Sequence, residues 1–228
     1  MIDKAFVGGA DKNVEWLLPW WFSRLQKNTS NPIFIYDFGL STKARKWAER
    51  KEIELLTLEN NNGWFMKPAT LLNTPAKQKI WIDVDCEVVK PIDDLFSFIE
   101  EDKIAVAPDP MHSWGCKYNS GVVGVQDNPK ALEDWKKMCD NPQQYGQMGR
   151  GDQELLWEMI KEDKNPPLSY IPKQYNWLRM YIERHRKYHK DVRIIHWTGQ
   201  RGKDIIAKSV RNKISTLQVL RNNKGKND

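Results

Sequence analysis

In the first third of the chain, short continuous apolar runs alternate with stretches of helical spacing. The runs cover residues 4–7, 32–39 and 53–58. Between them lie residues 16–25, with tryptophan and leucine at near-helical spacing, and a charged stretch at 41–51 that Ser41 is expected to cap. This strand, helix, strand, helix, strand order predicts an α/β fold with a mostly parallel sheet flanked by helices on both faces.

The rest of the chain continues the same pattern. We expect helices at 65–72, 91–101, 131–138 and 152–161, and strands at 80–82, 104–109, 118–126, 169–171 and 193–196. Residues 144–151 read as a glycine-bearing loop, residues 205–220 as one weak amphipathic stretch, and the last residues as a polar end. No repeat or linker divides the chain, so we expect one Rossmann-like domain over 1–203 and a basic helix or tail over 204–228.

Composition is that of an ordinary globular protein. The chain has 228 residues, of which 40% are hydrophobic and 29% charged, enough to bury one sizeable core. It has neither a run of about 20 apolar residues nor a secretory signal, so we expect a soluble protein made in the cytoplasm. The three cysteines are odd in number and widely spaced, which favours reduced thiols.

Positive charge is concentrated near the C-terminus. From Arg184 onward there are 13 Lys or Arg against 3 Asp or Glu, within a chain of net charge +6. Such a segment can attract the phosphates of a nucleotide, an anionic membrane surface or a nucleic acid. It can equally be a solvated tail that aids solubility, and charge does not decide among these.

The segment with the clearest chemistry is KIWIDVDCEVV, where Asp83 and Asp85 directly follow a buried strand. Two neighbouring carboxylates repel each other and resist burial unless positive charge compensates them. A divalent cation such as Mg²⁺ or Mn²⁺ would do so and leave positions open for phosphate oxygens. In the alternative reading, the aspartates cap the following helix or pair with lysines.

Four blocks of sequence, which together span about residues 63–203, resemble glycosyltransferase family 8 and related enzymes of the GT-A fold. They are FMKPATLLNTPAKQKIWIDVDCEVVKPIDDLF, YNSGVVGV, GDQELL and IIHWTGQRGK, and they occur in the family's order. The resemblance implies a GT-A fold and a transferase that moves sugar from a nucleotide sugar, such as a UDP-sugar, to a glycan or glycolipid or another hydroxyl acceptor.

The resemblance also implies a metal site made of Asp83, Asp85 and His196. A neutral imidazole suits Mn²⁺ better than Mg²⁺, although a lone histidine is more often a core residue. It further implies a set of donor-binding residues: Gly8, Gly9, Asp37, Lys67, Asp83, Asn119, Ser120, Gly199 and Lys203. The lysine of the closing motif lies seven residues after the histidine instead of the family's six, so Arg201 is a second candidate for that position.

Several of these residues also have purely structural readings. Lys67 can be a surface lysine, Asp37 can cap the helix that follows it, and the glycine pair is a permissive turn in many proteins. Asn119 and Ser120 can stabilise a turn.

The catalytic candidates are Asp152, Gln153 and Asp109. An inverting enzyme needs a base, for which Asp152 is the first candidate and Asp109 the second. A retaining enzyme, which the family favours, would place Asp152 or Gln153 beneath the sugar ring. Trp114, in a loop, is the candidate for acceptor contact, whereas Trp16, Trp20 and Trp81 are expected in the core.

Two other functions are weighed against the transferase. A nucleic-acid-binding protein without catalytic activity would use the basic C-terminus, but no recognised basic and aromatic module is present. A zinc hydrolase could use His185 and His189, but HRKYH lacks the glutamate of HExxH.

Overall fold

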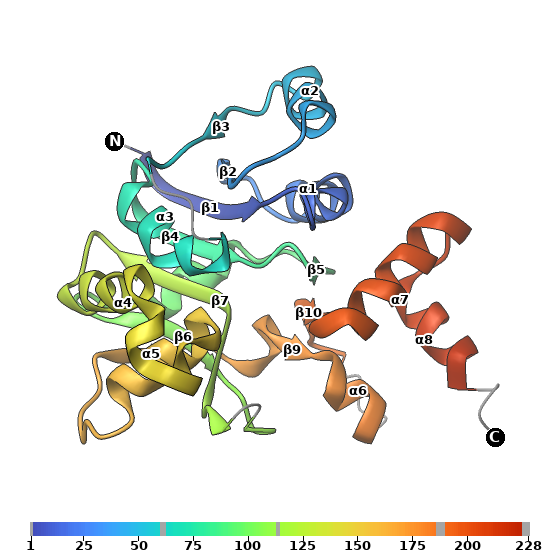
Figure 1. The fold of residues 1–228 in the computed structure, drawn as a ribbon. Helices are drawn as coiled ribbons and strands as arrows, with labels where there is room; N and C mark the ends of the chain where they lie inside the picture. The colour runs from blue at the N-terminus through green and yellow to red at the C-terminus, as the bar shows by residue number, and fades with distance from the viewer. Residues whose placement is uncertain (1, 60–62, 113–114, 186–189, 225–228) are drawn as a thin grey trace.

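A computed structural model gives the fold of residues 2–59, 63–112, 115–185 and 190–224 (Figure 1). Its centre is a seven-stranded sheet of order β3-β2-β1-β4-β7-β6-β8. The strands are β1 (Ile2–Ala10), β2 (Ile33–Asp37), β3 (Leu55–Leu56), β4 (Ala76–Ile82), β6 (Ile104–Pro108), β7 (Tyr118–Gln126) and β8 (Leu168–Tyr170). Neighbouring strands are parallel except where β7 pairs with β4 and β6. The mostly parallel sheet predicted from the sequence is thus confirmed.

Helices cover both faces of this sheet. They are α1 (Leu18–Gln26), α2 (Thr42–Arg50), α3 (Lys67–Asn73), α4 (Lys130–Asp140), α5 (Asp152–Ile160), α6 (Arg179–His185), α7 (Gly199–Asn212) and α8 (Thr216–Lys224). Short 3₁₀ helices are η1 (Glu15–Leu17), η2 (Gly63–Met66), η3 (Asp93–Phe98), η5 (Pro142–Arg150) and η6 (Lys173–Tyr175). As predicted, the Ser41 hydroxyl caps α2 by accepting a hydrogen bond from the Ala44 amide.

Alternate residues of the central strands point into two apolar clusters, because successive strand side chains face opposite sides. Val7 and Trp81 belong to the cluster under α3, α4 and α5. Phe6 and Ile80 belong to the cluster formed with α1, the second sheet and the C-terminal helices. Strands buried on both faces explain why the sequence shows continuous apolar runs.

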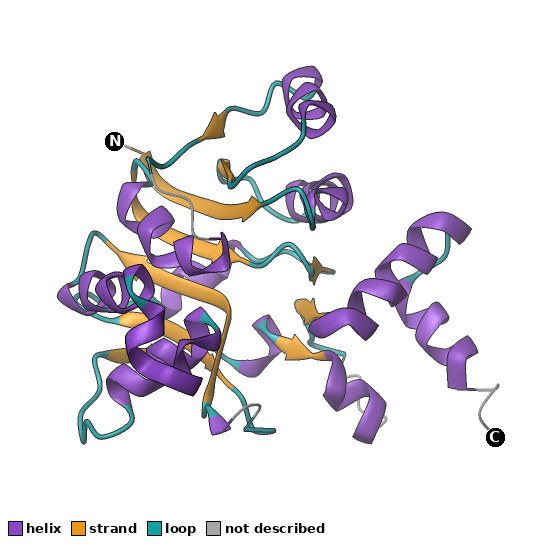
Figure 2. Cartoon of the chain, viewed as in Figure 1, coloured by secondary structure: helices purple, strands orange, loops and turns teal. Residues whose placement is uncertain are grey.

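The second sheet is small and lies between the main sheet and the C-terminal helices (Figure 2). Its order is β5-β10-β9, from β5 (Cys86–Val88), β10 (Ile194–His196) and β9 (Trp177–Leu178). The buried carboxylate of Glu87 accepts hydrogen bonds from Trp197 Nε1 at 3.0 Å and from Thr216 Oγ1 at 2.5 Å. Glu87 thus ties the start of α8 to β5.

The C-terminal segment is folded onto the domain as far as residue 224. The predicted boundary between residues 203 and 204 falls inside α7, and Ile205, Ile206, Val219 and Leu220 belong to the same apolar cluster as Phe6. The single amphipathic stretch expected at 205–220 is two helices, since Lys213 adopts a left-handed conformation with φ of 53° and ends α7.

Some local expectations were wrong. Residues 93–98 form the 3₁₀ helix η3 instead of an α-helix at 91–101, and the loop expected at 144–151 lies largely within η5. Trp20 and Trp81 are buried as predicted, but Trp16 is 43% exposed. Trp16 lies in η1, where residues turn by about 120° instead of 100°, so a helical wheel places it on the wrong face.

Two expectations about the whole chain can also be compared with the structure. Cys86, Cys116 and Cys139 are buried and carry no disulfide, as predicted. Among the helices of the described residues, none is long and apolar enough to cross a membrane.

Candidate active site

Two adjoining cavities open at the edge of the sheet where β4 ends and β7 begins. The larger measures about 720 Å³ and the smaller about 220 Å³. Trp64, Asp83, Asp85 and Asp152 line both. Because β7 runs antiparallel to β4, its first residues lie beside the residues that follow β4. The sheet therefore brings together the DVD segment and the NSG segment, two of the blocks noted in the sequence.

Backbone pairing then brings His196 to the two aspartates. A tight turn joins β4 to β5, with the Cys86 amide donating to the Asp83 carbonyl at 2.9 Å. In the second sheet His196 pairs with Cys86, and the Trp197 amide donates to the Asp85 carbonyl at 3.0 Å. A residue more than 110 positions away in the sequence is thus fixed beside the turn that carries both aspartates.

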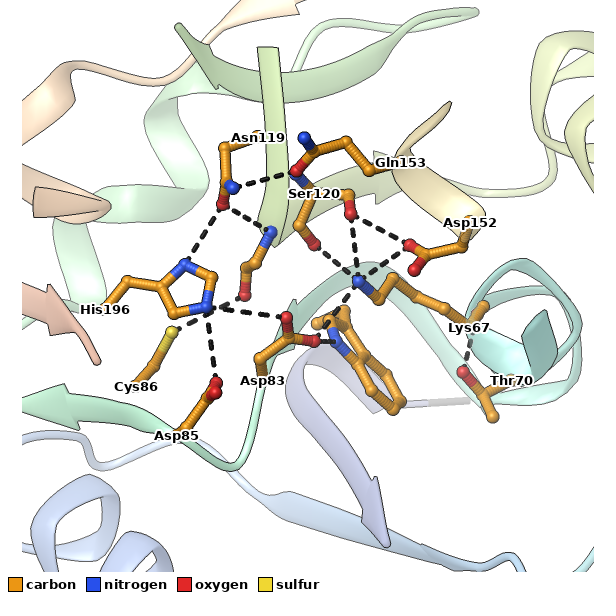
Figure 3. Close-up of polar contacts among 12 residues, drawn as sticks. Lys67, Thr70, Asp83, Asp85, Cys86, Asn119, Ser120, Asp152, Gln153 and His196 are labelled. Carbon is orange, nitrogen blue, oxygen red and sulfur yellow. Dashed lines mark hydrogen bonds and ion pairs between the residues drawn. The ribbon is translucent and has the colours of Figure 1, made fainter. Parts of the chain in front are cut away.

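The side chains of Asp83, Asp85 and His196 converge (Figure 3). His196 Nε2 lies 3.2 Å from Asp85 Oδ1 and 3.8 Å from Asp83 Oδ2. The other oxygen of each carboxylate faces a lysine, with Lys67 Nζ 3.2 Å from Asp83 Oδ1 and Lys203 Nζ 2.8 Å from Asp85 Oδ2. Each aspartate therefore presents one oxygen to the imidazole and one to an ammonium group.

The orientation of His196 is set by its other ring nitrogen. Nδ1 lies 3.0 Å from Asn119 Oδ1 and 3.0 Å from Asn176 Oδ1, and both are amide oxygens that only accept hydrogen bonds. Nδ1 must therefore carry a hydrogen. In the neutral imidazole this leaves the Nε2 lone pair directed at the aspartates, the tautomer that a metal-ligating histidine needs.

The two aspartates differ in their electrostatic surroundings. Burial, together with the charges of Asp85 and Asp152, raises the pKa of Asp83 against the opposing effect of Lys67 and His196. Burial also disfavours the charged form of Asp85, but His196 and Lys203 outweigh it and hold the pKa of Asp85 below its usual range. Asp85 is thus the more firmly ionised of the pair.

Lys67 is the most tightly held charge in the site. The side chain is 3% exposed, and Nζ lies 2.8 Å from Asp152 Oδ2 and donates to the Ser120 carbonyl at 2.7 Å and to Ser120 Oγ at 3.1 Å. Burial opposes this charge, yet Asp152 and Asp83 raise the pKa of the ammonium above its ordinary value. Lys67 is buried, so the reading of it as a surface lysine is wrong.

Polar groups at the start of β7 form a hydrogen-bonded network with Gln153. Its Oε1 accepts hydrogen bonds from Asn119 Nδ2 at 2.8 Å and from the Ser120 amide at 3.2 Å. Ser120 Oγ donates to Asp152 Oδ2 at 2.9 Å. All four of these predicted residues line the larger cavity, so the structure brings them together with the aspartates.

A buried cysteine also lies close to this cluster. One ligand atom each from Asp85, Cys86 and His196 fall within 4.8 Å of one another. Burial raises the pKa of the Cys86 thiol well above its usual value, and Sγ faces the Gly121 carbonyl at 3.8 Å. Asp83, whose Oδ2 lies 3.8 Å from His196 Nε2, is not part of this more compact group.

The two cationic residues of the closing motif pair with different carboxylates. Gly199 begins α7 with φ of 71° and lines the larger cavity, while Lys203 lines the smaller one and contacts Asp85. Arg201 Nε instead lies 2.9 Å from Glu183 Oε1, and its side chain is 63% exposed. Of the two candidates for the position next to the phosphates, the structure brings only Lys203 to the aspartates.

Of the donor-binding residues predicted in the first two strands, one lines a cavity and two do not. Gly8 and Gly9 lie inside β1, which continues to Ala10, and only Gly9 lines the smaller cavity. A Cβ at Gly8 would lie 2.5 Å from the Trp21 ring, so Gly8 is a packing position. Asp37 accepts hydrogen bonds from the amides of the turn after β2 and pairs with Arg45 Nε at 2.6 Å.

One further candidate, Asp109, is not brought to the aspartates. Asp109 is fully buried in the turn after β6, where Oδ1 accepts from the Met111 amide at 2.9 Å, and it is not among the residues that line either cavity. Trp114 lies outside the described residues, so its contact with an acceptor stays a prediction. His189 and the side chain of His185, which were weighed for a zinc site and not favoured, also lie outside the described residues.

Three residues in this region were not predicted. Asn176 holds Nδ1 of His196, Gly121 packs against the same ring, and Trp64 lines both cavities with its side chain 67% exposed. A Cβ at Gly121 would lie 2.2 Å from His196 Cε1, so only glycine fits there. Gly121 lies within the NSG block, which is the one signal in the sequence that could have indicated it.

Comparison with known proteins finds similarity in structure but not in sequence. No family model and no curated protein matches the chain. The glycosyltransferase GlyE of Streptococcus pneumoniae TIGR4 superposes with a TM-score of 0.65 and 16% identity, over 87% of this chain and 56% of that one. The galactosyltransferase LgtC, in complex with donor and acceptor sugar analogues, gives 0.63 and 14%, over 86% and 87%.

A third structure extends the same picture. The bifunctional glycosyltransferase WbbM superposes with a TM-score of 0.61 and 9% identity, over 87% of this chain and 46% of that one. This chain thus spans about half the length of GlyE and WbbM and most of the length of LgtC. The chain has the GT-A glycosyltransferase fold.

Proposed function

We propose that the protein is a metal-dependent glycosyltransferase that moves a sugar from a nucleoside diphosphate sugar, such as a UDP-sugar, to a hydroxyl acceptor. The observation that carries the proposal is the convergence of Asp83 Oδ2, Asp85 Oδ1 and His196 Nε2 at the junction of two cavities. The GT-A fold and the resemblance to family 8 support the same reading.

The residues fit a divalent cation by their own chemistry. Two carboxylate oxygens and one imidazole nitrogen form a donor set that Mn²⁺ accepts, and the fixed Nδ1 hydrogen leaves Nε2 available. An ion held there would neutralise charge that develops on the leaving diphosphate. Imidazole favours Mn²⁺ over Mg²⁺, so we propose Mn²⁺ as the physiological ion.

The smaller cavity suits the nucleotide and the larger one the sugars. Gly9 and Lys203 line the smaller cavity, and Gly199, the first residue of α7, lines the larger cavity that adjoins it. The ammonium group of Lys203, together with the N-terminus of α7 in the adjoining cavity, would attract phosphate to the boundary between the two. The larger cavity is lined by Asn119, Ser120 and Gln153, whose side chains can bind sugar hydroxyls.

We assign the charge beneath the sugar ring to Asp152. Its contacts with Lys67 and Ser120 both use Oδ2, and the residue lines both cavities beside Asp83. Lys67 thereby holds Asp152 and Asp83 in fixed positions on one side of the reaction centre. We propose a retaining outcome, as in family 8, which the anomeric configuration of the product by NMR would test.

The acceptor is a glycan or glycolipid in this proposal, and the C-terminal helices contact an anionic membrane. Lys208, Arg211 and Arg221 are exposed on α7 and α8, and Lys213 is exposed between the two helices. These helices lie at the side of the molecule away from the main sheet (Figure 1). Each basic residue near an anionic surface contributes about 1 kcal/mol to attraction. Sedimentation with anionic but not with neutral vesicles is the expected result, and equal binding to both would contradict it.

The test of the proposed activity is turnover of a panel of nucleotide sugars with and without Mn²⁺. We expect hydrolysis or transfer that requires the metal and that falls at least about 100-fold in Asp85→Asn, a change that keeps the side chain's size. Near-normal turnover in Asp85→Asn, with an unchanged unfolding midpoint, would contradict the metal role. The alternative of a nucleic-acid-binding protein gains no support, since the similar structures are glycosyltransferases.

A further inference from the structure

The two lysines that contact the aspartates are held very differently. Lys67 has four polar contacts, to two carboxylates and to the Ser120 carbonyl and hydroxyl, and it is 3% exposed. For Lys203, Asp85 Oδ2 is the one polar partner found among the described residues, and the Lys203 side chain is 24% exposed. Lys67 is a fixed part of the site, whereas Lys203 can leave Asp85 by rotating its own side chain.

Lys203 also lies where a diphosphate would compete for it. The residue lines the smaller cavity and belongs to the first turns of α7. The start of this helix lies directly against the preceding segment, since a Cβ at Gly202 would lie 1.8 Å from the Trp197 carbonyl oxygen. Rotation of the four-carbon side chain is enough to separate Lys203 from Asp85, without a shift of the helix.

The net charge of the cluster explains why metal and donor would bind together. With His196 taken as the neutral imidazole, the three aspartates Asp83, Asp85 and Asp152 and the two lysines that contact them, Lys67 and Lys203, sum to a net charge of −1. A divalent cation alone would make this +1, and a nucleoside diphosphate sugar alone, with two negative charges, would make it −3. The two together restore −1, so each makes the binding of the other more favourable.

Building on the proposed function, we propose that Lys203 is an internal counter-ion of Asp85 that is transferred to the donor's diphosphate when metal and donor bind together. Before binding, the ammonium group occupies the carboxylate and lowers its affinity for a cation. In the loaded site Lys203 pairs with the diphosphate, and Asp85 is free to hold the metal. Metal and donor therefore bind cooperatively, and neither binds strongly alone.

The experiment is a titration of Mn²⁺ into the 228-residue protein without nucleotide, with free Mn²⁺ measured by electron paramagnetic resonance. Lys203→Met removes the charge and keeps the length of the side chain. We expect it to tighten Mn²⁺ binding about fivefold, since a part-buried ion pair is then no longer broken on binding. Saturating UDP should then raise the Mn²⁺ affinity of Lys203→Met by a smaller factor than it raises that of the wild type.

A matched control is Lys208→Met, which removes the same charge from an exposed position on the same helix and should leave Mn²⁺ affinity unchanged. Lys203→Gln serves if Lys203→Met does not fold. Wild-type or weaker Mn²⁺ affinity in the Lys203 variant overturns the inference. If the wild type binds no Mn²⁺ even with UDP, or if Asp85→Asn binds it normally, the proposed metal role falls and the inference with it.

Discussion

The sheet side and the helix side of the candidate site hold their charges in opposite ways. On the sheet side, Lys67, Asp83 and Asp152 share a buried network that includes the backbone of β7. On the helix side, Lys203 makes a single contact with Asp85, and Glu183 pairs both with the exposed Arg201 and with the largely buried Arg179. One side is a fixed framework, and the other can exchange partners.

This difference follows from what each side must do in the proposed reaction. The sheet side positions groups beneath a sugar, and positioning is most precise when buried charges are fully paired. The helix side must admit and release a charged nucleotide, which requires contacts that break at small cost. A single part-exposed ion pair, such as that of Lys203 with Asp85, meets that requirement better than the network around Lys67.

The largest difference in stability between the two sides is expected when Lys67→Met is compared with Lys203→Met. The change removes the cation shared by the buried Asp152 and the part-exposed Asp83, so we expect a loss of about 3 kcal/mol in the free energy of unfolding. Lys203→Met should cost below about 1 kcal/mol, because its pair is part-exposed and Asp85 keeps His196. Urea denaturation of both variants measures the difference, and equal losses would show that the two sides do not differ as described.

A second large effect is expected from Gly121→Ala, which introduces a methyl group into the space of the His196 ring. We expect Mn²⁺ affinity in the presence of UDP to fall about 10- to 100-fold, since the ring can no longer keep its orientation. Gly124→Ala, elsewhere on β7 and packed against Ile99, is the control for packing alone. Similar Mn²⁺ affinities in the two variants would argue against His196 as a ligand.

A smaller effect is expected from Asn176→Ala. The change removes one of the two oxygens that accept the Nδ1 hydrogen of His196, and Asn119 retains the other. We expect Mn²⁺ affinity to fall about tenfold. Calorimetric titration with Mn²⁺ and UDP measures it. Unchanged affinity would mean that Asn119 alone fixes the ring.

The smallest effect on stability is expected from Trp64→Ala, at the shared rim of both cavities. The side chain is 67% exposed, so the free energy of unfolding should change by less than about 0.5 kcal/mol. The KM for donor or acceptor should nevertheless rise, because the indole ring offers an apolar surface to a sugar or base. Trp16→Ala, exposed in η1 and lining neither cavity, is the matched control, and equal KM values in both variants would contradict a binding role.

The sequence predicts the sheet side far better than the helix side. Continuous apolar runs identify the parallel strands, and an apolar strand followed by DVD identifies the turn that carries Asp83 and Asp85. These signals are local, because each is contained in a few consecutive residues whose burial sets their hydrophobic pattern.

What the sequence does not predict depends on contacts between distant segments. Asn176 reaches His196 only through the pairing of β9 with β10, and nothing in the sequence around Asn176 indicates that register. The choice between Arg201 and Lys203 depends on where α7 begins, since two residues of offset turn a helical side chain by about 200°. The start of α7 at Gly199 decides for Lys203 as the partner of Asp85.

The central claim, that Asp83, Asp85 and His196 hold a divalent cation shared with a nucleoside diphosphate, is tested most directly in crystals grown with Mn²⁺ and UDP. An anomalous difference map recorded at the manganese edge should show one strong peak bonded to all three side chains and to the diphosphate. A nucleotide bound in the smaller cavity without such a peak, with Lys203 still on Asp85, would contradict the account.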